Sequence, residues 1–213
     1  MSECVKQNGK ILIFDFDGVI CDSFEEIILS LNSIARGGKI KNLSKLELNK
    51  FRYIETKEIF SLLGIKNEQL PVVIAEALKM LSAKMISLKL VQGIEKVLME
   101  LYSRGITLGI VTSNSKENVL SFLEHNQINY FNFVHTGDLF NKGEVLKKLI
   151  QNMAYDPENV FYVGDETRDI LASREAKVHS IAVGWGFNHK NVLIRHKPEY
   201  LLSSPDELLS LAD

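Results

Sequence analysis

Cysteine is scarce in this chain of 213 residues, and long apolar runs are missing from it. The two cysteines, Cys4 and Cys21, have neither the spacing of a zinc site nor the pattern of a disulfide framework. They are typical of thiols in a reducing compartment. The polar segment over residues 1–9 lacks the apolar stretch of a secretion signal, and no apolar run reaches the ~20 residues of a membrane-spanning helix. We therefore expect a cytoplasmic protein that has no membrane partner.

An excess of either charge is also missing. The chain has 25 Lys and Arg against 27 Asp and Glu, which gives a formal net charge of -2 at pH 7. This balance gives no reason to expect nucleic acid or an anionic membrane as a partner. Hydrophobic residues make up 46% of the chain and charged residues 24%, as in ordinary soluble proteins. A chain of this length forms either one large domain or one domain with an insertion.

The most informative stretch begins at Ile11 and ends at Gly18. Four apolar residues, Ile11–Phe14, follow one another without alternation, which is typical of a strand buried on both faces of a parallel sheet. Asp15 and Asp17 come directly after this run, and Gly18 gives the backbone the freedom to turn away. Two carboxylates at the end of a buried strand repel each other, and a bound cation would remove that cost. The alternative is that Asp15 ends the strand and Asp17 caps the next helix or turn.

The second half of the chain alternates between helical and strand patterns. Helices are predicted at residues 94–102 and 116–124, from residue 142 onward and again after residue 166. Apolar strands are predicted at residues 106–111, 130–135, 160–163 and 179–183. This alternation predicts an α/β fold with a doubly wound parallel sheet, which also includes the strand at residues 11–14.

Residues 21–90 form a predicted helical insertion. Apolar residues recur at helical spacing over residues 24–34, 54–63 and 71–88, and no strand is predicted from residue 38 to about residue 90. About seventy residues are too many for a single crossover between parallel strands. We therefore expect an all-helical cap subdomain at residues 21–90, inserted into an α/β core domain formed by residues 1–20 and 91–213.

The insertion is basic, whereas the rest of the chain is acidic. Residues 22–90 contain eleven Lys and Arg against eight Asp and Glu, a net charge of +3, which leaves -5 for the remainder. Six cations in one short part of it face only Glu47: Arg36, Lys39, Lys41, Lys45, Lys50 and Arg52. A basic cap would attract an anionic substrate, and Arg52, between two aromatic residues, is the first candidate for a substrate contact. The alternative is a solvated basic face.

Polar side chains follow the predicted strands at their carboxyl ends. In chain order they are Asp15 and Asp17, then Thr112, Ser113 and Asn114, then Lys142, and finally Asp165, Glu166 and Asp169. The carboxyl ends of parallel strands meet at one edge of the sheet, where ligands bind at the reversal of strand order. Independent helix caps are the alternative, and they explain the hydroxyl groups better than the acidic residues and the lysine.

Four motifs in this order resemble those of the haloacid dehalogenase superfamily, in particular its phosphatases. The motifs are Asp15-Phe16-Asp17-Gly18-Val19, the strand ending in Thr112-Ser113, Lys142-Gly143, and Gly164-Asp165-Glu166-Thr167-Arg168-Asp169. They extend over nearly the whole chain, and the predicted insertion resembles the helical cap of that family. Two further segments resemble phosphoglycolate-phosphatase-like members: Val183-Gly184-Trp185-Gly186-Phe187 and Lys197-Pro198-Glu199-Tyr200. The resemblance implies a Rossmann-like core that carries a helical cap.

The resemblance also implies a role for each matching acidic residue. Asp15 would attack phosphorus and form an aspartyl-phosphate, and Asp17 would protonate the leaving oxygen and later activate water. The implied metal site consists of Asp15, Asp165, the backbone carbonyl of Asp17, and Asp169 in support. An all-oxygen site shared with phosphate suits Mg2+ as the cofactor. The dehalogenases of the superfamily lack an aspartate at the position of Asp17, so dehalogenation is not expected.

The remaining motif residues are implied to contact the phosphoryl group. Ser113 would hydrogen-bond to it, while the adjacent hydroxyl of Thr112 stays open as the alternative, and Asn114 would also bind substrate. Lys142 would offset phosphate charge and hold Asp15 in place.

The sequence thus predicts Mg2+-dependent hydrolysis of a small phosphorylated metabolite, either a phosphoglycolate-like ester or a sugar phosphate. Two alternatives stay open. A phosphomutase of the β-phosphoglucomutase type would use the same residues but return phosphate to a bound sugar. A non-catalytic module would only bind a phosphorylated metabolite. Neither nucleic acid nor a membrane is an expected partner, and the sequence does not predict the oligomeric state.

Overall fold

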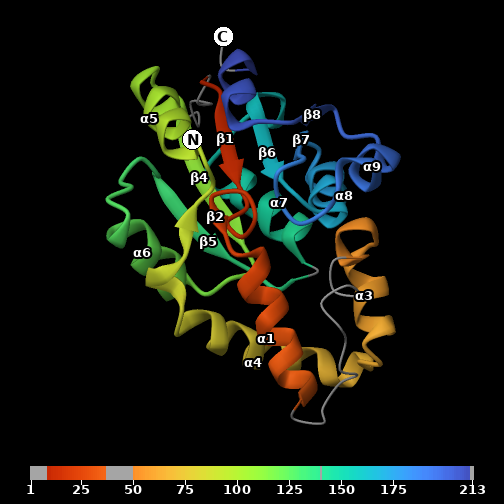
Figure 1. Ribbon diagram of the computed structural model, residues 1–213. Helices are drawn as coiled ribbons and strands as arrows, with labels where there is room; N and C mark the ends of the chain where they lie inside the picture. Colours follow the sequence, from red (N-terminus) through yellow and green to blue (C-terminus); the bar gives the residue numbers. More distant parts are fainter. Residues whose placement is uncertain (1–8, 37–49, 140, 212–213) are drawn as a thin grey trace.

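The computed structural model describes residues 9–36, 50–139 and 141–211. Its centre is a six-stranded parallel sheet (Figure 1). In spatial order the strands are β5 (Phe133–Thr136), β4 (Thr107–Thr112), β1 (Ile11–Phe14), β6 (Val160–Gly164), β7 (His179–Val183) and β8 (Tyr200–Leu202). The chain starts in the middle, adds β4 and β5 on one side, and continues with β6 to β8 on the other side. The strand order therefore reverses at β1, where an open α/β sheet forms its ligand site.

Helices cover both faces of the sheet. The core helices are α5 (Ile94–Ser103), α6 (Lys116–His125), α7 (Lys142–Asn152), α8 (Thr167–Ala176) and the short α9 (Lys190–Leu193). Leu12 and Phe14 of β1 pack in one apolar cluster with α5 and α6, while Ile11 and Ile13 pack in another with α7 and α8. All four β1 residues are therefore buried, which explains why the strand reads as a continuous apolar run.

A second group of helices lies beyond the carboxyl ends of the strands (Figure 1). It consists of α1 (Phe24–Arg36), α3 (Thr56–Leu62) and α4 (Leu70–Ser82). These helices have an apolar cluster of their own, which includes Ile28, Phe51, Ile59 and Val73. The two chain crossings between this helical layer and the sheet lie side by side, because β2 (Cys21–Asp22) pairs with β3 (Lys89–Leu90) in antiparallel orientation.

Short 3-10 helices complete the described part of the chain. They are η1 (Lys50–Tyr53), η2 (Asn67–Gln69), η3 (Met85–Ser87), η4 (Pro157–Asn159), η5 (Ile194–His196) and η6 (Pro205–Leu211). Within the described ranges, no helix has the length and apolar character that crossing a membrane requires.

The predicted α/β class with a parallel sheet is confirmed, and three local predictions are wrong. The prediction that no strand occurs from residue 38 to about residue 90 is wrong at β3, because a strand of two residues is too short to show a periodic pattern. The third helix of the insertion ends at Ser82 rather than near residue 88, because the chain turns there and Met85 packs into the core of the sheet. The strand expected at residues 130–135 is present but begins later, at Phe133, and ends one residue further on, at Thr136.

Candidate active site

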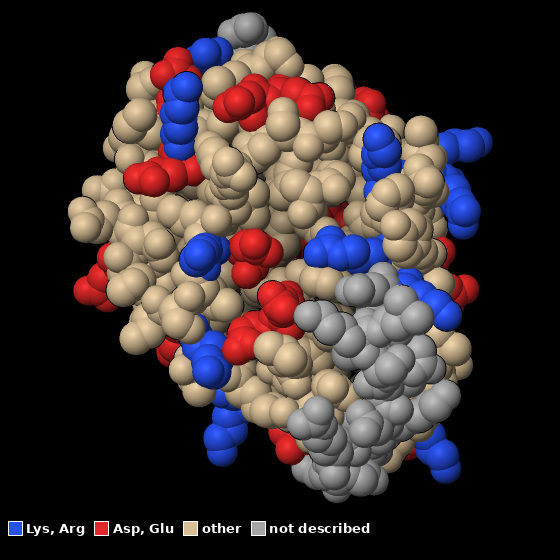
Figure 2. All heavy atoms as spheres, in the orientation of Figure 1, with Lys and Arg blue, Asp and Glu red and all other residues tan. Residues whose placement is uncertain are grey.

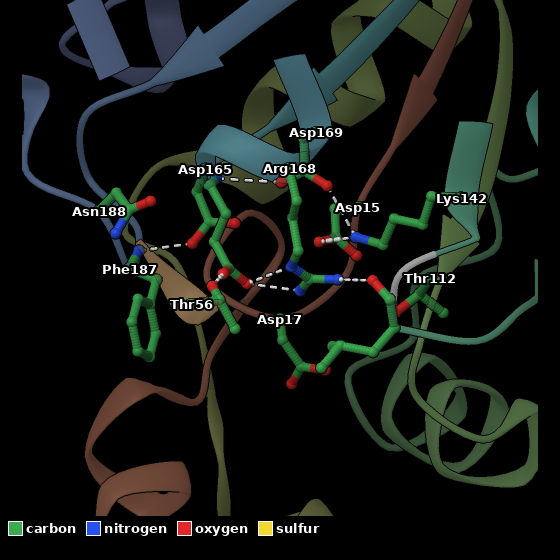
Figure 3. A network of polar contacts seen from close by, with 12 residues as sticks. Asp15, Asp17, Thr56, Thr112, Lys142, Asp165, Arg168, Asp169, Phe187 and Asn188 are labelled. Atoms are coloured by element: carbon green, nitrogen blue, oxygen red, sulfur yellow. Dashed lines mark hydrogen bonds and ion pairs between the residues drawn. The ribbon is translucent and has the colours of Figure 1, made fainter. Parts of the chain in front are cut away.

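Three aspartates converge at the carboxyl edge of the central strands (Figure 3). Asp15 directly follows β1, Asp165 directly follows β6, and Asp169 lies in the first turn of α8. One carboxylate oxygen of each lies within 4.8 Å of those of the other two. All three residues are at most 2% exposed. Negative charges gathered out of water at this density require nearby positive charge.

Lys142, the first residue of α7, supplies part of that charge from within the protein. Its Nζ donates hydrogen bonds to Asp15 Oδ2 and, at 2.8 Å, to Asp169 Oδ1. Burial acts to lower the pKa of Lys142, but its two carboxylate partners outweigh burial, and the pKa lies above its usual value. Burial likewise acts to raise the pKa of Asp169, but Lys142 and Arg168 outweigh it and lower that pKa.

The charges of the other two aspartates are less well compensated. Burial raises the pKa of Asp15 to about 6, against the opposing effect of Lys142. Burial, with Glu166 and Asp169 adding to it, raises the pKa of Asp165 well above its usual range. Asp165 Oδ2 accepts a hydrogen bond of 2.5 Å from the backbone N–H of Phe187, but its buried Oδ1 has no hydrogen-bond partner among the described residues. This surplus of hard oxygen ligands fits a divalent cation such as Mg2+.

Asp17 lies beside this cluster without belonging to it (Figure 3), and the chain turns directly after it, at Gly18. Gly18 has φ +75°, and a Cβ at this position would collide with the side chain of Asp165, so only glycine fits. Asn114 Nδ2 donates a 2.9 Å hydrogen bond to Asp17 Oδ2, and Asn118 Nδ2 holds Asn114 Oδ1 at 2.8 Å. Burial raises the pKa of Asp17, and the hydrogen bond from Asn114 partly offsets this shift. Asn114 thus orients Asp17 in this structure.

The two adjacent hydroxyl residues at the end of β4 point in different directions. Ser113 lines a cavity between the sheet and the helical layer, together with Asp17 and Asp165. Thr112 is fully buried, and its Oγ1 accepts a 3.1 Å hydrogen bond from the backbone N–H of Asn114. The structure therefore brings Ser113, rather than Thr112, to the surface that a phosphoryl group would contact.

The guanidinium of Arg52 has its described contacts outside the acidic cluster, although Asp165 is close enough to oppose the lowering of its pKa by burial. Its Nη1 donates a 2.5 Å hydrogen bond to the carbonyl of Gly186, and its Cζ lies 3.6 Å from the ring centroid of Phe24. Arg52 lines an outer groove together with Asp22 and Glu26. Figure 2 shows basic and acidic side chains interspersed on this face, beside the part of the chain that is not described.

Of the other cations of the basic stretch, Lys50 is the one whose side chain the structure describes. Lys39, Lys41 and Lys45 lie outside the described residues, as does the side chain of Arg36. Lys50 is exposed.

The sequence did not reveal a second polar network at the edge of the cavity. Arg168 Nε and Nη2 donate to Glu166 Oε1 at 2.9 and 2.5 Å, and its Nη1 donates to the carbonyl of Leu139 at 3.0 Å. Thr56 of α3 donates from Oγ1 to Glu166 Oε2, so the network links the helical layer to the sheet (Figure 3). Side chains two positions apart normally do not face each other on a helix. The spacing of Glu166 and Arg168 therefore did not predict that they pair, although both residues belong to the fourth motif.

The chain belongs to the haloacid dehalogenase-like hydrolase family, which its sequence matches over residues 12–183. A phosphoglycolate phosphatase of Synechococcus elongatus is 31% identical over 200 residues, which cover 93% of this chain and 94% of that protein. A phosphoglycolate phosphatase of Vibrio cholerae is 25% identical over 218 residues, covering 95% and 96%.

A solved structure also resembles this chain over most of its length. It is that of a predicted phosphatase from Clostridium acetobutylicum, which superposes with a TM-score of 0.82 at 24% identity, covering 95% of this chain and 97% of that one. At this level of identity the likeness shows the fold.

Proposed function

We propose that this phosphatase of the haloacid dehalogenase-like family hydrolyses a small phosphomonoester with Mg2+, through an aspartyl-phosphate formed on Asp15. The observation that carries the proposal is the buried cluster at the reversal of strand order. It joins Asp15, Asp165, Asp169 and Lys142, and Asp17 lies beside it on the wall of the cavity.

Asp15 is held as a nucleophile needs to be held. Lys142 contacts its Oδ2, and the backbone N–H of Phe16 donates to its Oδ1 at 2.7 Å, so the carboxylate has one fixed orientation. A fixed carboxylate lowers the entropic cost of the in-line attack on phosphorus. The attack forms a bond between Asp15 and phosphorus and breaks the bond from phosphorus to the leaving oxygen.

Asp17 is suited to move the proton in both half-reactions. Its raised pKa favours the protonated form, which gives its proton to the leaving oxygen. As a carboxylate it then takes a proton from the water that attacks phosphorus, which releases phosphate and restores Asp15. Asn114 keeps the carboxyl group oriented through both steps.

Mg2+ would be held by Asp15 and Asp165 with Asp169 in support, and when bound it offsets the negative charge of the phosphoryl oxygens. Ser113 would hydrogen-bond to the phosphoryl group from the wall of the cavity. Lys142 would offset the remaining charge while it holds Asp15.

The names of the relatives make 2-phosphoglycolate the first substrate to test, followed by sugar phosphates. The experiment measures release of inorganic phosphate from a panel of phosphomonoesters with and without Mg2+. Asp15→Asn is expected to lower kcat by roughly 10⁴-fold or more, as removal of a nucleophile does. Asp206→Asn, at an exposed position in η6, is the matched control and should behave as wild type.

The other outcomes separate the alternatives. Turnover retained in Asp15→Asn would refute the nucleophile. A rearranged sugar phosphate without released phosphate would indicate a mutase. Tight binding of a phosphorylated metabolite without any turnover would indicate a binding module.

A further inference from the structure

The cavity beside the acidic cluster has two chemically different ends. It has a volume of about 130 Å³ and extends from the carboxyl edge of the sheet to the helical layer. Its sheet end is polar, since Asp17, Ser113 and Asp165 line it. A phosphoryl group placed for attack by Asp15 would occupy this end, so the opposite end receives the leaving group.

The opposite end is lined by apolar side chains from all three helices of the layer. They include Ile27 and Leu31 from α1, Ile59 and Phe60 from α3, and Ile74 and Leu78 from α4. An apolar cavity of ~150 Å³ in a protein is large enough to bind benzene. The whole cavity here is slightly smaller than that, and the phosphoryl group takes part of it, so the leaving group has about the size of a short alkyl chain.

The cationic groups near the cavity already have partners. Arg168 is the lining residue with a positive charge among those described, and each of its three guanidinium nitrogens donates to Glu166 or to the carbonyl of Leu139. Lys142 contacts two carboxylates of the acidic cluster.

Arg52 does not line the cavity: its guanidinium packs on the ring of Phe24 and donates to the carbonyl of Gly186. A carboxylate on the leaving group would therefore enter surroundings whose described lining is apolar and has no cation except Arg168, which is unfavourable.

The cavity is also bounded by polar contacts between the helical layer and the sheet domain. Thr56 contacts Glu166, Asn188 Nδ2 donates to the carbonyl of Ile54 at 3.1 Å, and the backbone N–H of His189 donates to the carbonyl of Arg52 at 2.6 Å. These contacts hold the helical layer against the sheet, and with it the apolar side chains opposite the reacting groups.

From this arrangement we infer that the preferred substrate is a short-chain alkyl phosphomonoester with an uncharged, apolar leaving group, rather than an ester whose leaving group carries a carboxylate. The inference rests on the proposed phosphatase function and deepens it. It gives a prediction opposite to the one drawn from the names of the relatives.

The test compares two phosphomonoesters of nearly equal shape on the Mg2+-loaded enzyme. Isobutyl phosphate has two methyl groups where 2-phosphoglycolate has two carboxylate oxygens. The expected kcat/KM is at least tenfold higher for isobutyl phosphate. Along a series of linear alkyl phosphates, kcat/KM should rise by roughly fourfold per methylene, the value of one buried methylene, until the cavity is full.

Two variants test whether the cavity determines the preference for isobutyl phosphate over 2-phosphoglycolate. Leu78→Lys introduces a cation at the apolar end and should reverse the preference in favour of 2-phosphoglycolate. Val72→Lys, at a 61% exposed position on the same helix, is its control and should leave the ratio unchanged. Ala77→Leu reduces the cavity and should shorten the preferred alkyl chain while ethyl phosphate is still hydrolysed.

Preferential hydrolysis of 2-phosphoglycolate by the wild-type enzyme would overturn this inference and leave the phosphatase function intact. The inference would also be overturned if Leu78→Lys left the ratio of the two kcat/KM values unchanged and Ala77→Leu left the preferred alkyl chain length unchanged. Failure of every phosphomonoester in the presence of Mg2+ would overturn both the inference and the function on which it rests.

Discussion

Replacing Lys142 by methionine removes the internal cation and retains most of the volume of the side chain. Asp15 and Asp169 then stay buried without the ion pairs that Lys142 forms with them. Removal of one partner of a buried pair costs about 3–5 kcal/mol. In a chain of this size, each kcal/mol lost from the free energy of unfolding lowers Tm by ~2–4 °C, so Tm is expected to fall by roughly 6–20 °C. Thermal unfolding is measured in EDTA, so that no added cation compensates for the lysine.

The same substitution should lower kcat/KM by about 10²–10³-fold, because Asp15 loses the group that orients it and the phosphoryl group loses a positive charge. Lys148→Met on the same helix is the matched control. Lys148 is 68% exposed and pairs with Glu144 at 2.7 Å, and solvent screens such a surface pair, so its loss should change Tm little. If Lys142→Met shifted Tm no more than Lys148→Met and kept its activity, the electrostatic role of Lys142 would be refuted.

Three further predictions follow from the site. EDTA should abolish phosphate release, and Mg2+ should restore it. Mg2+ should also raise the Tm of the wild-type protein but not that of Asp165→Asn. An equal rise of Tm in both proteins would contradict the metal site. Gly18→Ala should nearly abolish activity, because its Cβ meets Asp165 at positive φ. Gly64→Ala, also at positive φ but in open space, should cost about 1 kcal/mol in unfolding experiments and retain full turnover. Asn114→Ala should lower kcat by about tenfold with little change in KM, since it removes a hydrogen bond to Asp17; a changed KM at constant kcat would instead indicate a substrate contact.

The sequence predicted the parallel sheet because its strands are buried on both faces. Ile11–Phe14 and Val160–Val163 read as continuous apolar runs for that reason, and the alternation with helices then determined the class of fold. The edge strand β8 was not predicted, because a strand of only three residues, shortly after a proline, shows no recognisable alternation. The pair of β2 and β3 was missed because its register depends on residues far apart in the chain.

The candidate site was predictable where it depends on topology alone. Asp15 and Asp165 follow neighbouring parallel strands, so their proximity follows from the order of the elements. The choice between Thr112 and Ser113 depends on the direction of each side chain at the end of a strand, which composition and spacing do not determine. The partner of Arg168 depends on how the chain turns before α8, and the roles of all these residues in catalysis stay predictions.

The pairing of Cys21 with Leu90 has a consequence for the modular construction of this molecule. The chain leaves the sheet for the helical layer and returns to it at one point, so the two ends of the inserted segment are adjacent. Segments of different length could therefore be inserted there without moving the strands apart. A helical unit from another protein, grafted between these two strands, should leave the sheet able to fold only if it replaces the apolar contacts that Leu81 and Met85 make with the core of the sheet. A chimaera that keeps these two side chains could change the helices over the cavity and still retain the core of the sheet.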